Sequence, residues 1–501
     1  MKNILVIGIG PHARRTHLPA LAAGQARGLV GTISGVDIRD TRGSGSSADT
    51  TGHGGPVPLT LVDRFDPTSR RLPEPVRRVL DDLVRERRID AVVVATEPAV
   101  HLAYTRWALD RDLSVLLDKP VTARRDCSTD PAQAHGILDD FDDLLECCRR
   151  ARQRDPRTLV TVLCQRRYHP AFRLVRERIA EITAATGCPV TSIQAHHSDG
   201  QWRLPDELRD LSYHGFEQGY GKIAHSGYHF LDLVPWLLAA GETDRTRLDS
   251  ADVHAAVARP RDVLAQLGST AHERLMPGFA DRNPYTEHQL RRDTHGFGEV
   301  DAMLSLTFRS RGHVMTLGGV TLLHNGFSQR GGLTAANSDL YRGNGRVRHE
   351  TLILHQGPFQ TVHVHSLQTL PGTVNVDDHA PGGALHVEIH VFRNGRLRGD
   401  WQTYTHYDPD AITTAGGAEP TQEAARRRAI EEFLDYLHGR RAREDLVSDL
   451  DGHRRGVALM AGAYLSTARQ WEGGPSTATV DFTADVRPAP ACDRTWAGAA
   501  G

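Results

Sequence analysis

The stretch Ile4-Leu5-Val6-Ile7-Gly8-Ile9-Gly10-Pro11-His12-Ala13, near the amino terminus, decides the fold. Its first four residues are apolar and mostly β-branched, without alternation, which is typical of a strand buried on both faces of a parallel sheet. The turn that follows fits the form G-x-G-x-x-G/A, and residues 16–22 continue it with helix-compatible sequence. Glycines at such a turn let the backbone approach a pyrophosphate at the positive end of a helix. The stretch predicts a dinucleotide site, and a tight turn without a nucleotide is the alternative.

An acidic residue closes the second predicted strand, which covers residues 29–36. Asp37 stands where a carboxylate accepts hydrogen bonds from a ribose 2′-hydroxyl, and this favours NAD as the cofactor. Arg39 follows closely and could instead attract a 2′-phosphate. NADP therefore stays possible.

Two more buried strands are predicted at residues 89–96 and 113–117, and the second ends in Asp118-Lys119-Pro120. Strands that alternate with helical stretches imply an α/β fold with a doubly wound parallel sheet, which binds ligands beyond the carboxyl ends of its strands. Lys119 falls at that edge, where its ammonium could lower the pKa of a substrate hydroxyl and stabilise the alkoxide. The alternative is an ion pair between Lys119 and Asp118.

Lysine is rare in this chain, because among its 60 Lys and Arg residues only Lys2, Lys119 and Lys222 are lysines. A lysine kept inside a motif of an arginine-rich chain indicates chemistry that needs a compact ammonium.

The stretch 219–232 is the most unusual one. If its second half is helical, His225, His229 and Asp232 share one face. His229 could then act as a general base, although one of 27 histidines could equally be a hydrogen-bonded core residue. His225 and His229 also have the spacing of a helical metal pair, but no second ligand-rich segment accompanies them, so we predict no metal.

Composition excludes several classes of partner. The 501 residues carry 60 Lys plus Arg against 62 Asp plus Glu, so there is no overall positive field for nucleic acid or anionic lipid. No apolar run is long enough to span a bilayer, and we expect a cytoplasmic protein. The six cysteines form no Cys-x-x-Cys pair, which predicts reduced thiols.

The chain is expected to divide into a nucleotide-binding domain at 1–155, a second domain at 156–471 and a flexible tail at 472–501. The second domain has segments of alternating or β-rich sequence, which predict an open, mainly antiparallel sheet. The late helices are expected at 422–438 and 452–470, and insertions near 40–57, 123–136 and 258–298.

Several stretches together resemble the Gfo/Idh/MocA family, the relatives of glucose-fructose oxidoreductase and inositol dehydrogenase. They are residues 4–21, residues 89–98 with His101, Asp118-Lys119-Pro120, Arg167-Tyr168-His169-Pro170, residues 219–238, and the late stretches 429–434, 448–450 and 463–466. The resemblance implies an N-terminal Rossmann domain that binds NAD(P) and a C-terminal α/β domain whose open sheet forms the substrate cleft. It also implies a homodimer or homotetramer.

The resemblance assigns roles to individual residues. The implied reaction moves a hydride between nicotinamide and a carbinol carbon of a sugar, cyclitol or related polyol. His229 would take the hydroxyl proton and Lys119 would steady the oxyanion, while His225 occupies the family's usual aspartate position and could share the base role. The implied cofactor contacts are Gly8, Gly10, Pro11, His12, Ala13, Asp37, Arg39, Thr96, Pro98, His101 and Lys119.

Two other functions stay open on the same fold. His225 makes an NAD-using reaction without net redox plausible, as in glycosidases that use bound NAD transiently. The second alternative is a non-catalytic protein that senses a nucleotide. In each case the expected partner is a small molecule, sugar-like for an enzyme.

Overall fold

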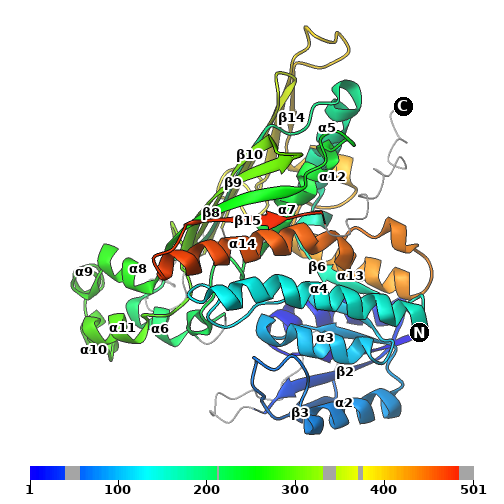
Figure 1. The fold of residues 1–501 in the computed structure, drawn as a ribbon, viewed down its shortest axis with the longest axis vertical. Coiled ribbons are helices and arrows are strands. Elements are labelled where there is room, and N and C mark those ends of the chain that lie inside the picture. The colour runs from blue at the N-terminus through cyan, green and yellow to red at the C-terminus, as the bar shows by residue number, and fades with distance from the viewer. Residues whose placement is uncertain (40–56, 212–213, 331–345, 370–375, 484–501) are drawn as a thin grey trace.

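The structure is a computed structural model that describes residues 1–39, 57–211, 214–330, 346–369 and 376–483. A smaller sheet with helices on its faces forms the lower part of Figure 1, and a larger sheet rises above it. In the described part of the chain, no helix combines the length and apolar character that crossing a membrane requires.

The first sheet has six parallel strands in the order β3-β2-β1-β4-β5-β6. The strands are β1 Lys2–Ile7, β2 Val30–Ile38, β3 Leu59–Val62, β4 Ala91–Val94, β5 Ser114–Asp118 and β6 Val160–Leu163. The order reverses between β1 and β4, and the crevice at the carboxyl ends of these strands is where such sheets bind ligands. The predicted doubly wound parallel sheet is confirmed.

Helices cover both faces of this sheet, which explains the unbroken apolar run of β1. Ile4 and Val6 pack in one core cluster with Phe433, whereas Leu5 and Ile7 belong to the cluster on the other face. The helices of this part of the chain are α1 Leu18–Ala26, α2 Glu74–Arg87, α3 His101–Leu109, α4 Pro131–Arg154 and α13 Gln422–Leu437.

The division of the chain differs from the expected one in two ways. β6 completes the first sheet, so the expected boundary after residue 155 falls before the last strand of that sheet. α13 comes from the late part of the chain and packs on the same sheet, because Ala429, Ile430 and Phe433 bury their side chains against it.

In the described residues, the second sheet has nine strands in the order β14-β13-β12-β11-β7-β10-β9-β8-β15, of which β7 and β10 pair in parallel and the others antiparallel. Its strands are β7 Ser192–Gln201, β8 Ser250–Ala258, β9 Asp301–Ser310, β10 His313–Asn325, β11 Val347–Gln356, β12 Gln360–Thr369, β13 Glu388–Arg393, β14 Tyr404–Tyr407 and β15 Thr477–Asp481. The predicted open, mainly antiparallel sheet is confirmed.

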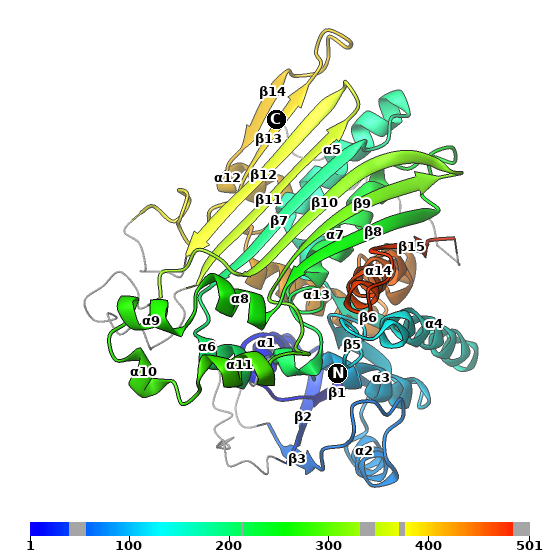
Figure 2. The same ribbon diagram turned by 60° about the vertical axis from the view of Figure 1, so that its left-hand side comes forward.

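Helices lie on one side of the second sheet, and Figure 2 shows its other face uncovered. These helices are α5 Pro170–Thr186, α7 Tyr228–Leu238, α12 Pro409–Gly416 and α14 Arg454–Trp471. The uncovered face accounts for the alternating burial along β9, β10 and β12.

Three expected irregular segments are more ordered than their composition indicates. The insertion near 258–298 holds α8 Pro260–Gln266, α9 Ser269–Leu275, α10 Phe279–Arg282 and α11 Glu287–Asp293, next to α6 Pro205–Asp210. The insertion near 123–136 already contains the start of α4. The expected tail contributes β15, which pairs with β8, while residues 484–501 and most of the insertion at 40–57 lie outside the described residues.

Candidate active site at the carboxyl edge of the first sheet

The glycine turn is built as the sequence predicts. Gly8 has a φ of 91°, and a Cβ at this position would lie 2.5 Å from the carbonyl oxygen of Ala95. At Gly10 a Cβ would meet no atom within 4 Å, so the space beside this residue is open. Ala13 is fully buried at the start of the helical turn that leads into α1. The turn thus offers the open approach that a pyrophosphate requires.

The two glycines provide a matched pair of substitutions. Gly8→Ala forces a left-handed backbone onto alanine and drives its Cβ into Ala95, so we expect a loss of stability of at least about 1–3 kcal/mol, measured by thermal unfolding. Gly10→Ala has room for its methyl group and should unfold near the wild-type temperature, yet bind NADH more weakly in a fluorescence titration. Equal unfolding temperatures for the two variants would contradict this assignment.

Asp37 lies against the glycine turn. Its Oδ2 accepts a hydrogen bond of 3.2 Å from the backbone N–H of Ile9, and its Oδ1 accepts one of 2.8 Å from Ile38. Arg39 is 61% exposed and pairs with the exposed Asp63 at 3.3 Å. The carboxylate at the turn is therefore fixed, as recognition of a ribose hydroxyl requires, whereas Arg39 extends toward solvent.

A histidine that the sequence analysis did not single out anchors the loop that carries Lys119. The fully buried His17 lies with its Nε2 3.0 Å from Oδ1 of Asp118, and Nε2 of His12 lies 3.7 Å from Oδ2. Burial acts to raise the pKa of Asp118, but the two imidazoles outweigh it and hold this pKa below its usual value. Burial lowers the pKa of His12 to about 4. The glycine-turn helix and the end of β5 are thereby joined.

Lys119 is directed at the motif loop of the second domain. Its Nζ donates a hydrogen bond of 2.8 Å to the backbone carbonyl of His225. Burial lowers the pKa of Lys119 below its ordinary 10.5, and the nearby Asp118 opposes this shift. Because Asp118 is bound by His17 and His12, Lys119 remains able to donate to a ligand.

Thr96, Pro98 and His101 follow β4 at the same edge. His101 is fully buried, with Nδ1 2.8 Å from the carbonyl oxygen of Pro120 and Nε2 3.0 Å from that of Thr96. Its ring thus ties the loop after β4 to the loop that carries Lys119. Direct contact of Thr96, Pro98 and His101 with the cofactor stays a prediction.

The histidines of the motif do not share one helical face. α7 begins at Tyr228, so His229 lies on its first turn and His225 precedes it. Asp232 is bound by Arg167 at 2.6 Å and by His453 at 2.9 Å. His225, His229 and Asp232 are therefore not brought together as a ligand set.

A buried glutamate shapes the loop that leads to these histidines. Oε1 of Glu299 accepts hydrogen bonds from the N–H groups of Gly221 at 3.2 Å and Ile223 at 2.8 Å, and from Tyr464 Oη at 3.0 Å. Glu299 adjoins the segment expected to be an insertion, and nothing in the sequence indicated this role.

His225 and His229 are both 6% exposed and neutral. Nε2 of His225 and Nδ1 of His229 are buried without a hydrogen-bond partner. Burial, with Arg166 and Lys119 next, lowers the pKa of His229 well below 6.5. Burial also lowers that of His225. Each imidazole is therefore in the form that can accept a proton.

A second buried lysine supports this loop. Lys222 is fully buried, and its Nζ donates to Asp199 Oδ2 at 2.7 Å, to Ser226 Oγ at 2.9 Å and to His197 Nδ1 at 2.9 Å. Asp199 also binds Arg346 at 2.6 Å. Sequence spacing did not predict this network.

The residues present fit a dinucleotide. The turn leaves open space at Gly10, Asp37 is fixed beside it, and His229 has an unpartnered ring nitrogen near the same sheet edge. Gly8, Gly10, Ala13 and Asp37 would hold the cofactor.

Residues 2–136 match the family model GFO_IDH_MocA, described as an oxidoreductase family with an NAD-binding Rossmann fold. The match lies within the first domain, and it agrees with the predicted resemblance. The predicted NAD-binding Rossmann fold is confirmed for these residues. No curated protein matches the sequence significantly.

Solved structures share the fold over nearly the whole chain. The WlbA dehydrogenase from Bordetella pertussis, solved with NADH and UDP-GlcNAcA, is 14% identical with a TM-score of 0.52 and covers 97% of this chain and 98% of its own. Levoglucosan dehydrogenase, solved with NADH and levoglucosan, is 14% identical with a TM-score of 0.55 and covers 96% and 99%. An oxidoreductase from Agrobacterium radiobacter, solved with NAD+, L-tartaric acid and magnesium, is 13% identical with a TM-score of 0.52 and covers 96% and 98%.

Proposed function

We propose that this protein is an NAD-dependent dehydrogenase that transfers a hydride between nicotinamide and a carbinol carbon of a sugar, cyclitol or related polyol. The observation that carries the proposal is the approach of Lys119 to the motif loop, where its Nζ binds the carbonyl of His225, four residues before His229. An ammonium and a neutral imidazole thus face the sheet edge at which the glycine turn offers its cofactor site.

The reaction follows from these two groups. NAD, when bound, supplies the nicotinamide carbon that accepts or returns the hydride. His229 takes the proton of the substrate hydroxyl, because its Nδ1 has no other partner. Lys119 donates a hydrogen bond to the same oxygen and stabilises the charge that develops on it. His225 offers a second unpartnered nitrogen, which could share the proton.

The proposal is tested with the purified wild-type protein. We expect NADH to bind more tightly than NADPH in a fluorescence titration, because Asp37 would repel a 2′-phosphate. Incubation with NAD+ and a panel of sugars and polyols should then produce NADH absorbance. Binding of neither cofactor would overturn the proposal, and sugar conversion without accumulated NADH would favour the non-redox alternative.

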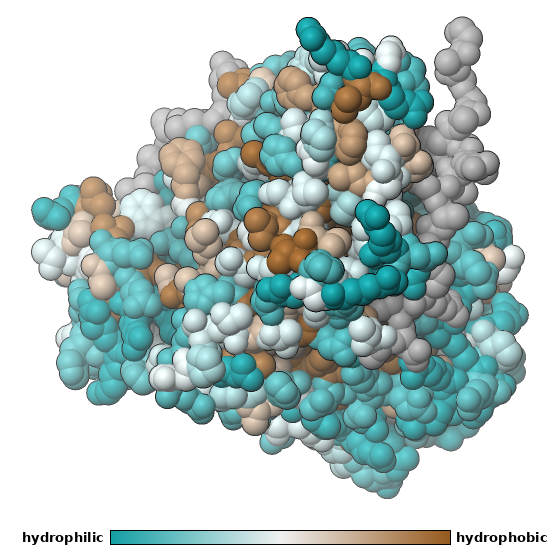
Figure 3. Space-filling model, turned by 45° about the horizontal axis from the view of Figure 1, so that its top comes forward, coloured by the Kyte–Doolittle hydropathy of each residue, from teal (hydrophilic) through white to brown (hydrophobic). Residues whose placement is uncertain are grey.

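We also infer a cytoplasmic homodimer or homotetramer that assembles through the uncovered face of the second sheet. Among the exposed apolar side chains of this sheet are Met303 at 61%, Leu317 at 57% and Phe392 at 43%. Figure 3 draws the molecule from another side, where hydrophobic side chains gather toward the middle with hydrophilic ones around them. The described cysteines are all free thiols, in keeping with a reducing compartment. Light scattering of the purified protein tests the assembly.

A further inference from the structure

The cleft side of the second sheet carries more cations than carboxylates. Arg346 and Arg348 lie at the start of β11, Arg166 lies in the turn after β6, and Arg426 lies on α13. These four arginines and Lys222 converge on the region beside His229, and two buried carboxylates, Asp199 and Glu350, lie among them.

Both carboxylates are already engaged by other cations. Asp199 binds Lys222 at 2.7 Å and Arg346 at 2.6 Å. Glu350 accepts a hydrogen bond from Nη2 of Arg166, which is 3% exposed. Both carboxylates therefore already have a direct cationic partner, and Glu350 acts on Arg348 only beyond ion-pair distance.

Arg348 is the cation left over. Its hydrogen bond goes to the neutral amide oxygen of Gln368 at 3.4 Å, and among the described residues no carboxylate lies within ion-pair distance of it. Burial and the neighbouring Arg346 lower the pKa of Arg348 to about 10, although Glu350 opposes this shift. Arg348 is half-buried, and withdrawing a cation from water with no carboxylate at ion-pair distance costs free energy unless a ligand supplies the charge.

Arg426 adds to this surplus from the first domain's side. Its side chain is 16% exposed, and its partner Glu423, at 3.1 Å, is 73% exposed and therefore screened by solvent. Burial and the nearby Arg166 lower the pKa of Arg426, although Glu423 opposes this shift. Nε of Arg166 is buried without a hydrogen-bond partner.

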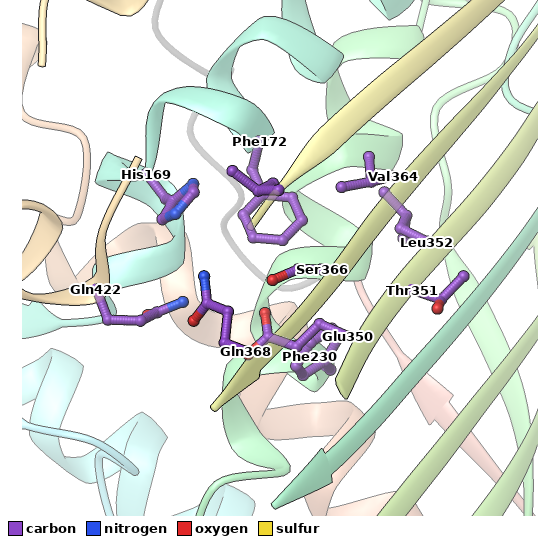
Figure 4. Close-up of a pocket in the computed structure, with 11 residues that line it drawn as sticks. His169, Phe172, Phe230, Glu350, Thr351, Leu352, Val364, Ser366, Gln368 and Gln422 are labelled. Atoms are coloured by element: carbon purple, nitrogen blue, oxygen red, sulfur yellow. The ribbon is translucent and has the colours of Figure 1, made fainter. Parts of the chain in front are cut away.

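The pocket in Figure 4 is lined in part by Gln368, the residue to which Arg348 donates its hydrogen bond. Glu350, Gln368 and Gln422 lie together at its polar end, with apolar side chains such as Phe172 and Val364 at the other. Oε1 of Gln422 is buried without a partner. A cavity of about 10 Å³ holds about one water molecule, so this pocket is too small to take a sugar.

We propose that the substrate carries an anionic group, a carboxylate or a phosphate, which Arg348 and Arg426 bind while its carbinol carbon faces His229. The inference rests on the proposed function and names the substrate class. A guanidinium suits this task because its planar donors match the oxygens of a carboxylate or phosphate in pairs.

The test measures binding to the NAD+-loaded protein by calorimetry, with D-glucuronate, D-glucose 6-phosphate, inorganic phosphate and D-glucose as probes. At least one anionic probe should bind at least tenfold more tightly than glucose. Comparing the affinity of glucuronate with that of glucose 6-phosphate shows whether the site prefers a carboxylate or a phosphate. Arg348→Met should weaken that binding at least tenfold, and Arg426→Met gives a second test if the first variant folds poorly. Arg309→Met is the matched control, because Arg309, on β9, already pairs with Asp252 on the neighbouring β8.

Each outcome decides the inference. Binding of glucose as tight as that of every anion, binding of no anion at all, or unchanged anion binding in both cleft variants would overturn it. Because the readout requires no turnover, oxidation of neutral polyols without anion binding would leave the proposed function standing and refute only the anionic substrate. Anion binding that depends on Arg348, with no NADH formed from any probe or polyol, would instead count against the proposed function.

Discussion

Replacing Lys119 with methionine should lower kcat by roughly 10²–10³-fold while NADH binding is retained. Methionine keeps an unbranched apolar stem in the buried site but removes the ammonium that steadies the substrate oxygen. The hydrogen bond from Nζ to the carbonyl of His225 is lost as well, which should lower stability by about 1–3 kcal/mol. Steady-state kinetics gives the first quantity, and thermal unfolding and an NADH titration give the other two.

Lys2→Met is the matched control. Lys2 is partly exposed and pairs with Asp90 at 3.2 Å at the amino end of β1, away from the cofactor edge. This variant should keep wild-type kcat. Wild-type turnover in Lys119→Met would refute the role of Lys119 in the reaction, and loss of NADH binding would show that it acts on the cofactor site instead.

The first domain could be predicted from sequence because its signals are local. The apolar run of β1 needs cover on both faces, and the glycine turn needs a left-handed backbone at Gly8, so both appear within one short stretch. The helix that covers one of those faces could not be predicted. α13 lies late in the chain, and nothing in its own pattern says which sheet Phe433 will pack against.

The candidate site was predicted in part for the same reason. Lys119 stood out because lysine is rare in this chain and it follows a buried strand. The contact between His17 and Asp118, which anchors the loop that carries Lys119, joins residues far apart in sequence. The arginines near His229 come from separate elements in an arginine-rich chain. The spacing of His225 and His229 predicted one shared helix face, and this prediction was wrong. Periodicity does not show where a helix begins, and α7 begins at Tyr228.

His229→Asn should lower kcat by roughly 10²–10⁴-fold, because asparagine preserves a polar side chain of similar reach but cannot take a proton. The pH profile separates this role from a structural one. Burial with Arg166 and Lys119 holds the pKa of His229 well below 6.5, so the base is deprotonated at neutral pH and wild-type kcat/KM should be flat there. Activity should fall only as the pH drops through that lowered pKa. His229→Asn should lose this acid limb.

The basic limb belongs to Lys119 and should survive in His229→Asn. Lys119 donates only when protonated, so activity should fall as the pH rises through a pKa that burial lowers from 10.5. An acid limb that persists in His229→Asn would contradict the assignment of the base. His225→Asn then decides the matter, since Nε2 of His225 is also buried without a hydrogen-bond partner and Lys119 binds the backbone of His225. If its substitution removes the limb, the proton goes to the histidine that stands where the family usually has aspartate.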